Sequence, residues 1–564
     1  MDSRVALNTE LGSVEGLSNG LWDSFLGLPY ATPPLGSLRF APAQLWSKRW
    51  DGVKDATTFG SPCHQSTGYW DQDPSEHPFP SAPPPSEDCL FLNIFRPSLK
   101  PSSELDAAVT KRLLPVMLWV HGGGLCGGAG SSAWQHGGKF AHAGDAIVVT
   151  INYRLGPLGF LAHPELEKTY GASGGANGLL DQITALRWVQ AHIRAFGGNP
   201  SEVTLAGESS GGVSTCAINS SPRASGLFRR AIVQSGPCIV SSEGWGPGSA
   251  QAGYTVGFAL RQQLNASTIA ELRALPPQVL QWDNTTLSSD LFSGYWLDGT
   301  VDDNGFAVAA AAPVLPWPPM VTYSSGKTVA SELIVGHTSQ DGTAAFYSKA
   351  PLANASVTGW DGWMEQRFGA KAAAVKGRYS LERYSHMPYT AVSASFVSAD
   401  GDERVACPSR RLAELASRQG VHVYAFAFHH LEVNCDVSFE LQVLPWWQPR
   451  ERLARSGWAS HGSEVKYLFN TTAGPDNCAA ATTPVAVARS VCPKDPSEVA
   501  LATEMMRRWG DFVSGRRPWE PFKPRGSLGS SATRTLRLRT ADAGGSDVVN
   551  NYKAGDCAFW ARHG

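Results

Sequence analysis

Residues 203–212 read Val203-Thr204-Leu205-Ala206-Gly207-Glu208-Ser209-Ser210-Gly211-Gly212. The first four form an apolar run typical of a buried strand, and residues 212–218 are compatible with a helix. Between them, Gly-x-Ser-x-Gly suits a sharp strand-to-helix turn, because glycine relieves the crowding on either side of an exposed serine. The helix that follows points its N–H groups and positive dipole end toward that serine. This context predicts that Ser209 is a nucleophile.

The same pattern occurs twice more, around Ser18 and around Ser173, without this context. Ser18 lies in a turn-rich N-terminal segment, and Ser173 lies in a loop before a helical stretch. We interpret both as serines in glycine-rich turns.

Two further apolar runs of strand length occupy residues 114–120 and 146–151. Strands that are apolar on both faces are typical of a buried parallel sheet. Residues 179–189, between the second run and residue 203, repeat their apolar positions at helical spacing. Strand, helix and strand in this order predict a right-handed crossover, and therefore an α/β fold class.

The composition excludes several classes of protein. Hydrophobic residues make up 42% of the chain and charged residues 17%, which excludes a disordered protein and a coiled coil. The formal net charge of −2 offers no basic surface for nucleic acid or an anionic membrane. The sequence contains no run of 18 apolar residues, so it predicts no transmembrane helix. Met1–Arg4 does not begin a signal peptide. At ~150 residues per domain, 564 residues predict three or four domains.

Four stretches together resemble the type-B carboxylesterases and cholinesterases. They are 196–212 with the serine motif, Ser86-Glu87-Asp88-Cys89-Leu90-Phe91-Leu92-Asn93-Ile94, residues 152–160, and Cys557-Ala558-Phe559-Trp560. The resemblance implies an α/β-hydrolase fold, with a large mixed, mostly parallel central sheet flanked by helices and with insertions that form a gorge. It runs nearly end to end, so we expect one domain over residues 1–564 in place of three or four.

A glycine-rich loop, His121-Gly122-Gly123-Gly124, follows the strand at residues 114–120. Gly122, Gly124 and Gly127 also match the dinucleotide pattern Gly-x-Gly-x-x-Gly, but no helix opens there and the next strand runs into Asn152, which is not acidic. The resemblance implies an oxyanion hole made by the N–H groups of Gly123, Gly124 and Ser210.

The resemblance also places the other two members of a catalytic triad, in the chain order nucleophile, acid, histidine. His461 is followed by glycine and, three residues on, by glutamate, as in the family's histidine motif. Asp341 lies five residues after Gly336, where the family usually carries glutamate. Either acid can orient the imidazole. The resemblance further implies a buried polar network of Glu208, Ser235 and Glu464, and structural ion pairs Arg39–Glu87 and Arg154–Asp181.

Ten cysteines raise the question of disulfides. The resemblance implies the pairs Cys63–Cys89 and Cys407–Cys557. Cys478 and Cys492 are candidates for a third pair across a 13-residue loop. We interpret the remaining four as buried small hydrophobic side chains, one of them inside the glycine-rich loop: Cys126, Cys216, Cys238 and Cys435.

Disulfides together with Asn-x-Ser/Thr sites favour an oxidising compartment and a secreted or secretory-pathway protein. These sites are Asn219, Asn265, Asn284, Asn354 and Asn470, of which we expect Asn219 to be buried and unmodified. We expect no metal and no cofactor. The expected partner is a small ester or lipid substrate, and no nucleic acid.

The expected reaction is hydrolysis of carboxylic esters through an acyl-enzyme. Acetylcholine is not the expected substrate, because Ala344 and Ala345 replace the aromatic pair of cholinesterases and Trp70 lies too near Cys63 for the choline-binding position. Two alternatives stay open: a neutral-lipid lipase of the same family, and a cholinesterase-like adhesion protein without activity.

Overall fold

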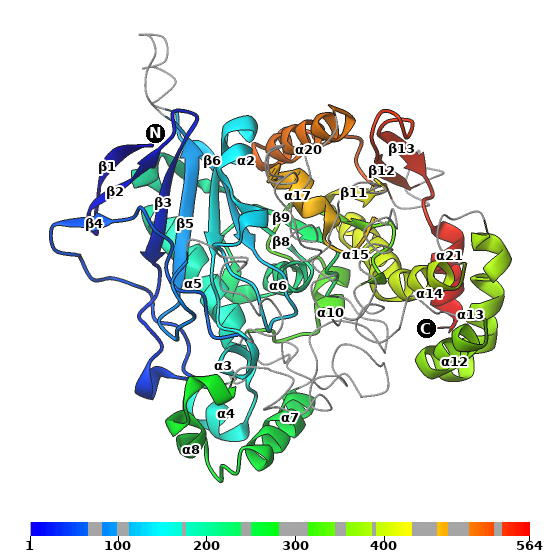
Figure 1. The fold of residues 1–564 in the computed structure, drawn as a ribbon, viewed down its shortest axis with the longest axis horizontal. Helices are drawn as coiled ribbons and strands as arrows, with labels where there is room; N and C mark the ends of the chain where they lie inside the picture. Colours follow the sequence, from blue (N-terminus) through cyan, green and yellow to red (C-terminus); the bar gives the residue numbers. More distant parts are fainter. Residues whose placement is uncertain are drawn as a thin grey trace, which may run out of the picture.

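One mixed sheet organises the chain in the computed structural model, which describes residues 2–65, 82–98, 112–171, 176–238, 250–280, 314–343, 357–385, 391–430, 459–471, 496–523 and 533–563. The strand order in the described residues is β1-β2-β3-β5-β7-β6-β8-β9-β10-β11-β12-β13, with β4 paired to β2 (Figure 1). The strands are β1 (Ser3–Thr9), β2 (Gly12–Ser18), β3 (Trp22–Pro29), β4 (Val53–Asp55), β5 (Phe91–Pro97), β6 (Leu114–Val120), β7 (Ile147–Ile151), β8 (Gly198–Glu208), β9 (Arg230–Gln234), β10 (Glu332–Thr338), β11 (His422–Phe428), β12 (Arg534–Leu538) and β13 (Asp547–Asn550).

The middle of the sheet is parallel, from β7 through β6, β8, β9, β10 and β11 to β12. The strands at both edges pair antiparallel, except β4, which pairs parallel with β2. The apolar runs at 114–120 and 146–151 correspond to β6 and β7, and the run at 203–206 lies in the buried part of the longer strand β8. The expected mixed, mostly parallel sheet is therefore confirmed.

Helices pack on both faces of this sheet, and others lie beyond it. They are α2 (Gly138–Gly144), α3 (Gly156–Phe160), α4 (Pro164–Tyr170), α5 (Asn177–His192), α6 (Ser210–Asn219), α7 (Ala250–Gln263), α8 (Ile269–Ala274), α10 (Pro319–Ser324), α12 (Val357–Phe368), α13 (Ala372–Arg378), α14 (Ala391–Gly401), α15 (Cys407–Arg418), α17 (Ser463–Phe469), α20 (Pro496–Val513) and α21 (Ala554–His563). The helix expected at 179–189 is the centre of α5.

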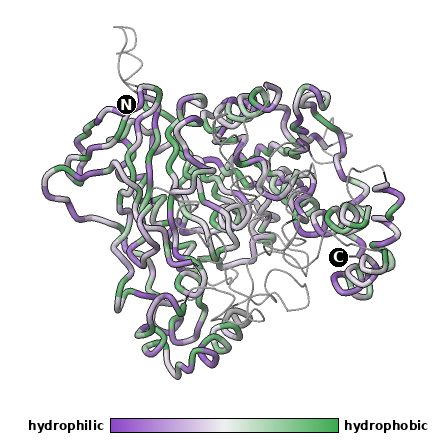
Figure 2. Tube along the Cα trace, in the orientation of Figure 1, coloured by the Kyte–Doolittle hydropathy of each residue, from purple (hydrophilic) through white to green (hydrophobic). Residues whose placement is uncertain are grey.

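Strand β6 shows how the two faces form separate cores. Its alternate residues Val116, Leu118 and Val120 pack with α5 and α6, whereas Met117 and Trp119 pack with α2, α17 and α20. Successive side chains of a strand point to opposite faces, so an apolar run of this length fills both cores. Figure 2 shows hydrophobic residues along these central strands.

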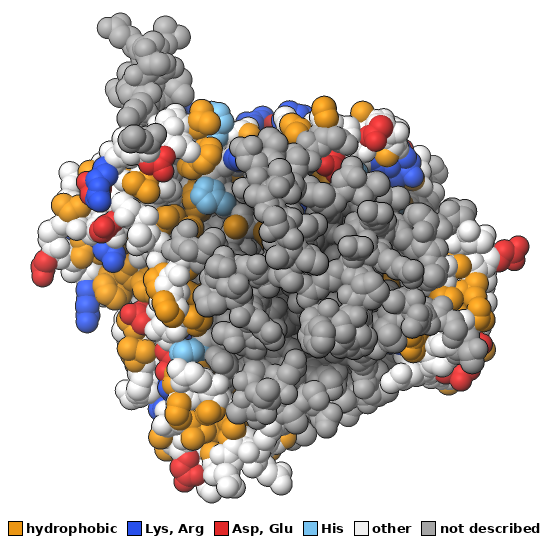
Figure 3. Space-filling view, in the orientation of Figure 1, with side chains coloured by type: hydrophobic (Ala, Val, Ile, Leu, Met, Phe, Trp, Pro, Cys, Tyr) orange, Lys and Arg blue, Asp and Glu red, His pale blue; other side chains and the backbone are white. Residues whose placement is uncertain are grey.

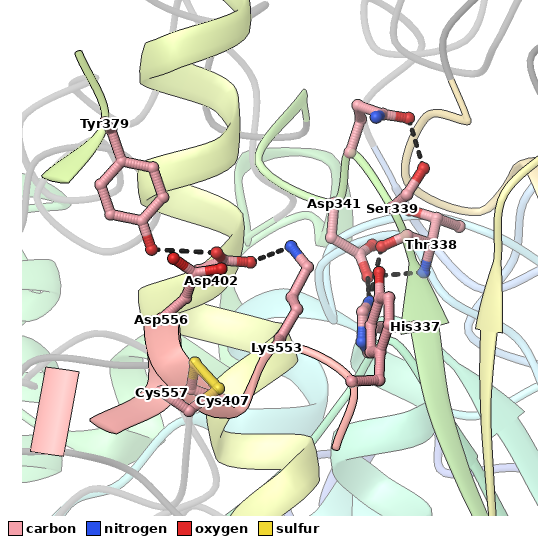
Figure 4. Close-up of polar contacts among 12 residues, drawn as sticks. His337, Thr338, Ser339, Asp341, Tyr379, Asp402, Cys407, Lys553, Asp556 and Cys557 are labelled. Atoms are coloured by element: carbon pink, nitrogen blue, oxygen red, sulfur yellow. Dashed lines mark hydrogen bonds and ion pairs between the residues drawn. A yellow bond between two sulfur atoms is a disulfide. The ribbon is translucent and has the colours of Figure 1, made fainter. Parts of the chain in front are cut away.

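A third core lies at the C-terminal side of the molecule, among α12, α13, α14 and α21 (Figure 1). The disulfide Cys407–Cys557 ties α21 to the start of α15, across a sequence separation of 150 residues. Beside it, the carboxylate of Asp402 accepts a hydrogen bond from Tyr379 (2.9 Å) and pairs with Lys553 (Figure 4).

The structure joins Cys63 to Cys89 as well, so it contains both disulfides that the resemblance implies. The interpretation of Cys216 and Cys238 as unpaired side chains is wrong, because these two residues form a disulfide. Helix α6 packs on β9, and Cys238 lies four positions after the end of β9. This packing brings the Cα atoms of Cys216 and Cys238 to a distance of 5.5 Å. Cys435, Cys478 and Cys492 lie outside the described residues.

On the described surface, acidic and basic side chains are interspersed along the upper and left edges of the view in Figure 3. Within the described ranges, none of the helices combines the length and the apolar character needed to cross a membrane.

Candidate active site

Ser209 lies at the turn between β8 and α6, which begins at the next residue. Its backbone has φ 55° and ψ −127°, a conformation that costs energy for a residue other than glycine. The flanking glycines are required by close backbone approach: a Cβ on Gly207 would lie 2.4 Å from the carbonyl oxygen of Gly211, and one on Gly211 would lie 2.1 Å from that of Val120. The predicted strand-to-helix turn is therefore present, and it holds Ser209 in a strained position.

His461 bridges Ser209 and Asp341, although the three residues are far apart in the sequence. Its Nε2 lies 2.8 Å from Oγ of Ser209, and its Nδ1 lies 2.7 Å from Oδ1 of Asp341. All three residues are buried. The structure thus brings together the three residues that the sequence proposes as a triad.

The loop that carries His461 is bound to the loop that carries Asp341. Gln340 donates its backbone N–H to the carbonyl of Ala459 (3.2 Å), and its side-chain Oε1 accepts from the N–H of Ala459 (3.0 Å). Oγ1 of Thr343 accepts from the N–H of His461 (2.9 Å). These contacts fix the imidazole relative to the carboxylate before any substrate binds.

The two carboxylate oxygens of Asp341 bind different groups. Oδ1 faces His461, while Oδ2 accepts hydrogen bonds from the N–H of Thr338 (2.9 Å) and from Oγ of Ser235 (3.1 Å). Figure 4 shows Asp341 beside Thr338, just past the end of β10. With Oδ2 held by two fixed donors, the carboxylate is presented to the imidazole in one orientation. The shorter acid, where the family usually carries glutamate, therefore reaches the histidine.

Two buried glutamates, Glu208 and Glu464, belong to the same region as His461. Oε1 of Glu208 is 3.4 Å from Nε2 of His461. Glu464 is fully buried, and its Oε1 accepts a hydrogen bond from Gln234 (3.1 Å), whose own Oε1 accepts from the indole of Trp509 (2.9 Å). Burial and the negative charges of Glu208 and Asp341 raise the pKa of Glu464 to about 8. The folded site therefore favours the protonated form of Glu464.

The raised pKa of Glu464 predicts a pH dependence of stability. Its pKa in the folded protein lies above the ordinary value of 4.5, so the folded state binds the proton more tightly than the unfolded state. The contribution to stability is complete below the ordinary pKa and is lost as the pH rises through about 8. Between about pH 5 and about pH 9, we expect the melting temperature of Glu464→Gln to fall less than that of the unsubstituted protein.

Thermal melting at several pH values measures this difference. The control is Glu382→Gln, a substitution of an exposed glutamate, which should leave the pH profile unchanged. Parallel pH profiles for Glu464→Gln and the unsubstituted protein would contradict the buried, protonated state.

The glycine-rich loop after β6 lies directly against the serine. A Cβ placed on Gly122 would come within 3.0 Å of Cβ of Ser209. Gly123 and Gly124 have φ values of 103° and 67°, which other residues rarely adopt. Oγ of Ser210 accepts a hydrogen bond from the N–H of Leu125 (3.2 Å), so the loop is bound to the first turn of α6. Gly123, Gly124 and Ser210 therefore lie on two segments that meet beside Ser209.

Cys126, within this loop, is a free cysteine whose Sγ lies 3.1 Å from the carbonyl oxygen of Gly124. Burial raises the pKa of this thiol to about 12 and lowers that of His121 to about 4, so both side chains are neutral at physiological pH. A neutral thiol is a poor nucleophile. Among the described residues, no group of three or more His, Cys, Asp and Glu side chains could hold a metal ion.

The ion pairs expected from the resemblance are present. Nε of Arg39 lies 2.6 Å from Glu87, and the guanidinium of Arg154 makes two hydrogen bonds to Asp181 (2.6 and 2.8 Å). Asn219 is buried as expected: it donates to the hydroxyl of Tyr323 (2.8 Å) and accepts from the N–H of Ala330 (2.7 Å). Other positions singled out in the sequence lie outside the described residues: Trp70, Ser173, Asn284, Ala344, Ala345 and Asn354.

Sequence reasoning missed the supporting residues Gln65, Gln234, Gln340, Thr343 and Trp509. Each acts through a hydrogen bond to backbone or to a neighbouring side chain, and no motif marks such residues in a single sequence.

Comparison with known proteins places the chain in a family. The model of the carboxylesterase family matches residues 3–560. Phenmedipham hydrolase of Pseudarthrobacter oxydans is 32% identical over 432 residues, which cover 76% of this chain and 78% of that protein. Para-nitrobenzyl esterase of Bacillus subtilis is 42% identical over 230 residues, which cover 41% of this chain and only 43% of that protein.

Solved structures agree with the sequence comparisons. A thermophilic PNB esterase superposes with a TM-score of 0.73 at 25% identity, covering 99% of this chain and 100% of that one. With its sheet, its serine turn and a family match from residue 3 to residue 560, the chain belongs to the carboxylesterase family, a family of carboxylic-ester hydrolases with the α/β-hydrolase fold.

Proposed function

We propose that the protein hydrolyses carboxylic esters through a covalent acyl-enzyme on Ser209, with His461 as general base and acid and Asp341 as the orienting carboxylate. The observation that carries the proposal is the unbroken chain from Oγ of Ser209 to Nε2 of His461 (2.8 Å) and from Nδ1 of His461 to Asp341 (2.7 Å). A nucleophile, a base within hydrogen-bonding distance and a group that orients the base are the parts that nucleophilic catalysis needs.

In the first half of the reaction, Oγ of Ser209 attacks the ester carbonyl carbon while its proton passes to Nε2 of His461. The N–H groups of Gly123, Gly124 and Ser210 stabilise the oxyanion of the tetrahedral intermediate. The bond to the alcohol then breaks, and His461 returns the proton to the leaving oxygen. In the second half, water loses a proton to His461 and attacks the acyl carbon. The bond between the acyl group and Oγ of Ser209 then breaks, and His461 returns the proton to that oxygen, which releases the carboxylic acid and free Ser209. Asp341 stays ionised throughout.

A burst experiment tests the acyl-enzyme. When excess p-nitrophenyl acetate is mixed rapidly with the protein, we expect a burst of p-nitrophenol that precedes steady turnover, because acylation of an activated ester is usually faster than deacylation. The burst amplitude should equal the concentration of active sites. Turnover that leaves no acyl group on the protein, on rapid acid quench and mass measurement, would contradict the mechanism.

The relatives do not select one substrate. The names of the matched proteins refer to p-nitrobenzyl esters, phenmedipham and cocaine, which are chemically diverse. We therefore propose a general carboxylesterase. A panel of p-nitrophenyl esters of increasing acyl length distinguishes this from a neutral-lipid lipase: a carboxylesterase prefers short chains, and a lipase prefers long ones. The adhesion alternative requires a degraded site. Against it, Ser209, Asp341 and His461 are all retained in the sequence and lie within hydrogen-bonding distance along the chain Ser209–His461–Asp341.

We further propose an oxidising compartment for this protein. Three disulfides in the described part of the chain support it, since such bonds persist outside reducing cytosol. Asn265 is an exposed acceptor of N-linked sugar by sequence. Reduction of a mildly denatured sample followed by thiol counting tests the disulfides directly.

A further inference from the structure

The side chain of Gln65 holds the glycine-rich loop beside Ser209 at Gly128. Its Nε2 donates to the carbonyl of Gly128 (3.0 Å), and its Oε1 accepts from the N–H of the same residue (2.8 Å). Nε2 also donates to the carbonyl of Cys63 (3.1 Å). Gln65 is 4% exposed, so water does not compete for these bonds. An amide side chain can donate from its nitrogen and accept at its oxygen at the same time.

The backbone carries this restraint from Gly128 to the proposed oxyanion donors. The N–H of Gly127 donates to the carbonyl of Gly123 (2.9 Å), as does the N–H of Cys126 (3.1 Å). The carbonyl of Gly123 and the N–H of Gly124 belong to one planar, trans peptide group, so they point in opposite directions. Fixing the carbonyl therefore fixes the direction of the N–H of Gly124, one of the three proposed donors.

At Gly123 and Gly128 the loop is packed backbone against backbone, in addition to the bond that ties it to α6. A Cβ on Gly123 would lie 2.3 Å from the carbonyl oxygen of Gly127, and one on Gly128 would lie 2.3 Å from Nδ1 of His121. Both glycines have φ near +100°. Glycine allows this close turn but loses more conformational freedom on ordering than any other residue. Hydrogen bonds from outside the loop offset that cost.

The segment that presents Gln65 is itself fixed. Cys63, two residues before Gln65, forms a disulfide with Cys89 and pairs with Ser86 in an isolated β-bridge. The N–H of Ser86 donates to the carbonyl of Pro62 (2.9 Å). The side chain of Gln65 therefore extends toward the loop from a backbone segment that the disulfide holds in place.

We propose that Gln65 is a positioning residue for the oxyanion hole: it orients the N–H of Gly124 through the peptide groups of Gly127 and Gly128. This role rests on the proposed function of the glycine-rich loop. Removing an oxyanion donor costs about 10²–10³ in rate, and misdirecting one should cost less, so we expect kcat to fall about tenfold to hundredfold when Gln65 is replaced.

The test uses Gln65→Ala and Gln65→Glu in the full chain. The second variant keeps the size of the side chain and its acceptor for the N–H of Gly128, but it loses both donated bonds. Kinetic constants are expressed per active site, titrated with an organophosphate. We expect kcat to fall while KM stays within about threefold. The inhibition constant of a trifluoromethyl ketone, which forms an oxyanion when Ser209 adds to it, should rise by the same factor as kcat/KM falls.

The matched control is Gln190→Ala. Gln190, on α5, also donates its side-chain amide to two backbone carbonyls, those of Pro200 (2.7 Å) and Leu227 (2.8 Å). This control should keep kcat per site. If Gln65→Ala does not fold, Gln65→Glu decides by the same criteria.

A kcat within twofold of the unsubstituted value in either folded Gln65 variant would overturn the proposal. So would a lower kcat with unchanged affinity for the ketone, or an equal loss in Gln190→Ala. These results differ from failure of the proposed function, which would appear as undiminished hydrolysis by Ser209→Ala.

Discussion

Ser209→Ala is expected to lower kcat for ester hydrolysis by about 10⁶-fold, the size of the loss when the nucleophile of a serine triad is removed. The loss is large because the substitution removes the atom that forms the acyl-enzyme, and neither His461 nor Asp341 can replace it. Ser209 is strained at φ 55°, and alanine keeps the backbone turn without the hydroxyl. The melting temperature should therefore change little, and activity on p-nitrophenyl butyrate measures the loss.

Ser18→Ala is the matched control for this prediction. Ser18 stands in the same Gly-x-Ser-x-Gly pattern and is also buried, but it ends β2, and its hydroxyl lies 3.4 Å from that of Ser98. We expect Ser18→Ala to keep kcat. If Ser209→Ala retained more than about one hundredth of the activity, a different nucleophile would have to be sought.

Asp341→Asn is expected to lower kcat by about 10⁴-fold, as in triads where the acid is replaced by its amide. Oδ2 of Asp341 accepts from the N–H of Thr338 and from Ser235, so the NH₂ group of the introduced amide is directed toward His461. The imidazole must then turn its lone pair toward this NH₂ group and carry its proton on Nε2. In that tautomer it cannot accept the proton of Ser209.

Asp341→Glu separates the loss of charge from a change of geometry. It restores the acid that the family usually carries, so we expect it to be at least about 100-fold more active than the asparagine variant. The pH profile provides a second readout, because loss of the carboxylate should lower the apparent pKa of the base in kcat/KM. Activity of Asp341→Asn close to that of the unsubstituted protein would assign the role of the acid to another residue.

Much of the central sheet could be predicted from local patterns. Residues 114–120 are strand β6 without any shift of boundary, and residues 179–189 lie inside α5. Such apolar runs are long and flanked by glycine, so little else competes with a buried strand. The serine turn could also be predicted, because two glycines around a serine after a buried strand leave few other conformations.

Other features depend on contacts between distant segments, which a single sequence does not reveal. Cys216 and Cys238 pair because α6 packs on β9, a packing that no motif reports. Gln65 lies 63 residues before the glycine that it binds. Only the family resemblance identifies His461 and Asp341 in the sequence, since spacing by itself does not distinguish a base or its acid partner from other loop residues.

We also propose that the chain folds as one domain. Its sheet takes strands from Ser3–Thr9 to Asp547–Asn550, and Cys407–Cys557 ties the last helix to α15. Dividing the chain between members of the triad would separate paired strands and expose their apolar faces to water. A single cooperative unfolding transition, seen alike by tryptophan fluorescence and by circular dichroism, is the expected result.

The central claim is that Ser209 forms a covalent bond with the substrate's acyl group, and organophosphate labelling measures this most directly. After inactivation with a fluorophosphonate, digestion and mass spectrometry should find one adduct per chain, on Ser209, and the loss of activity should be stoichiometric with it. Label on another residue, or full labelling of Ser209 with activity retained, would contradict the account.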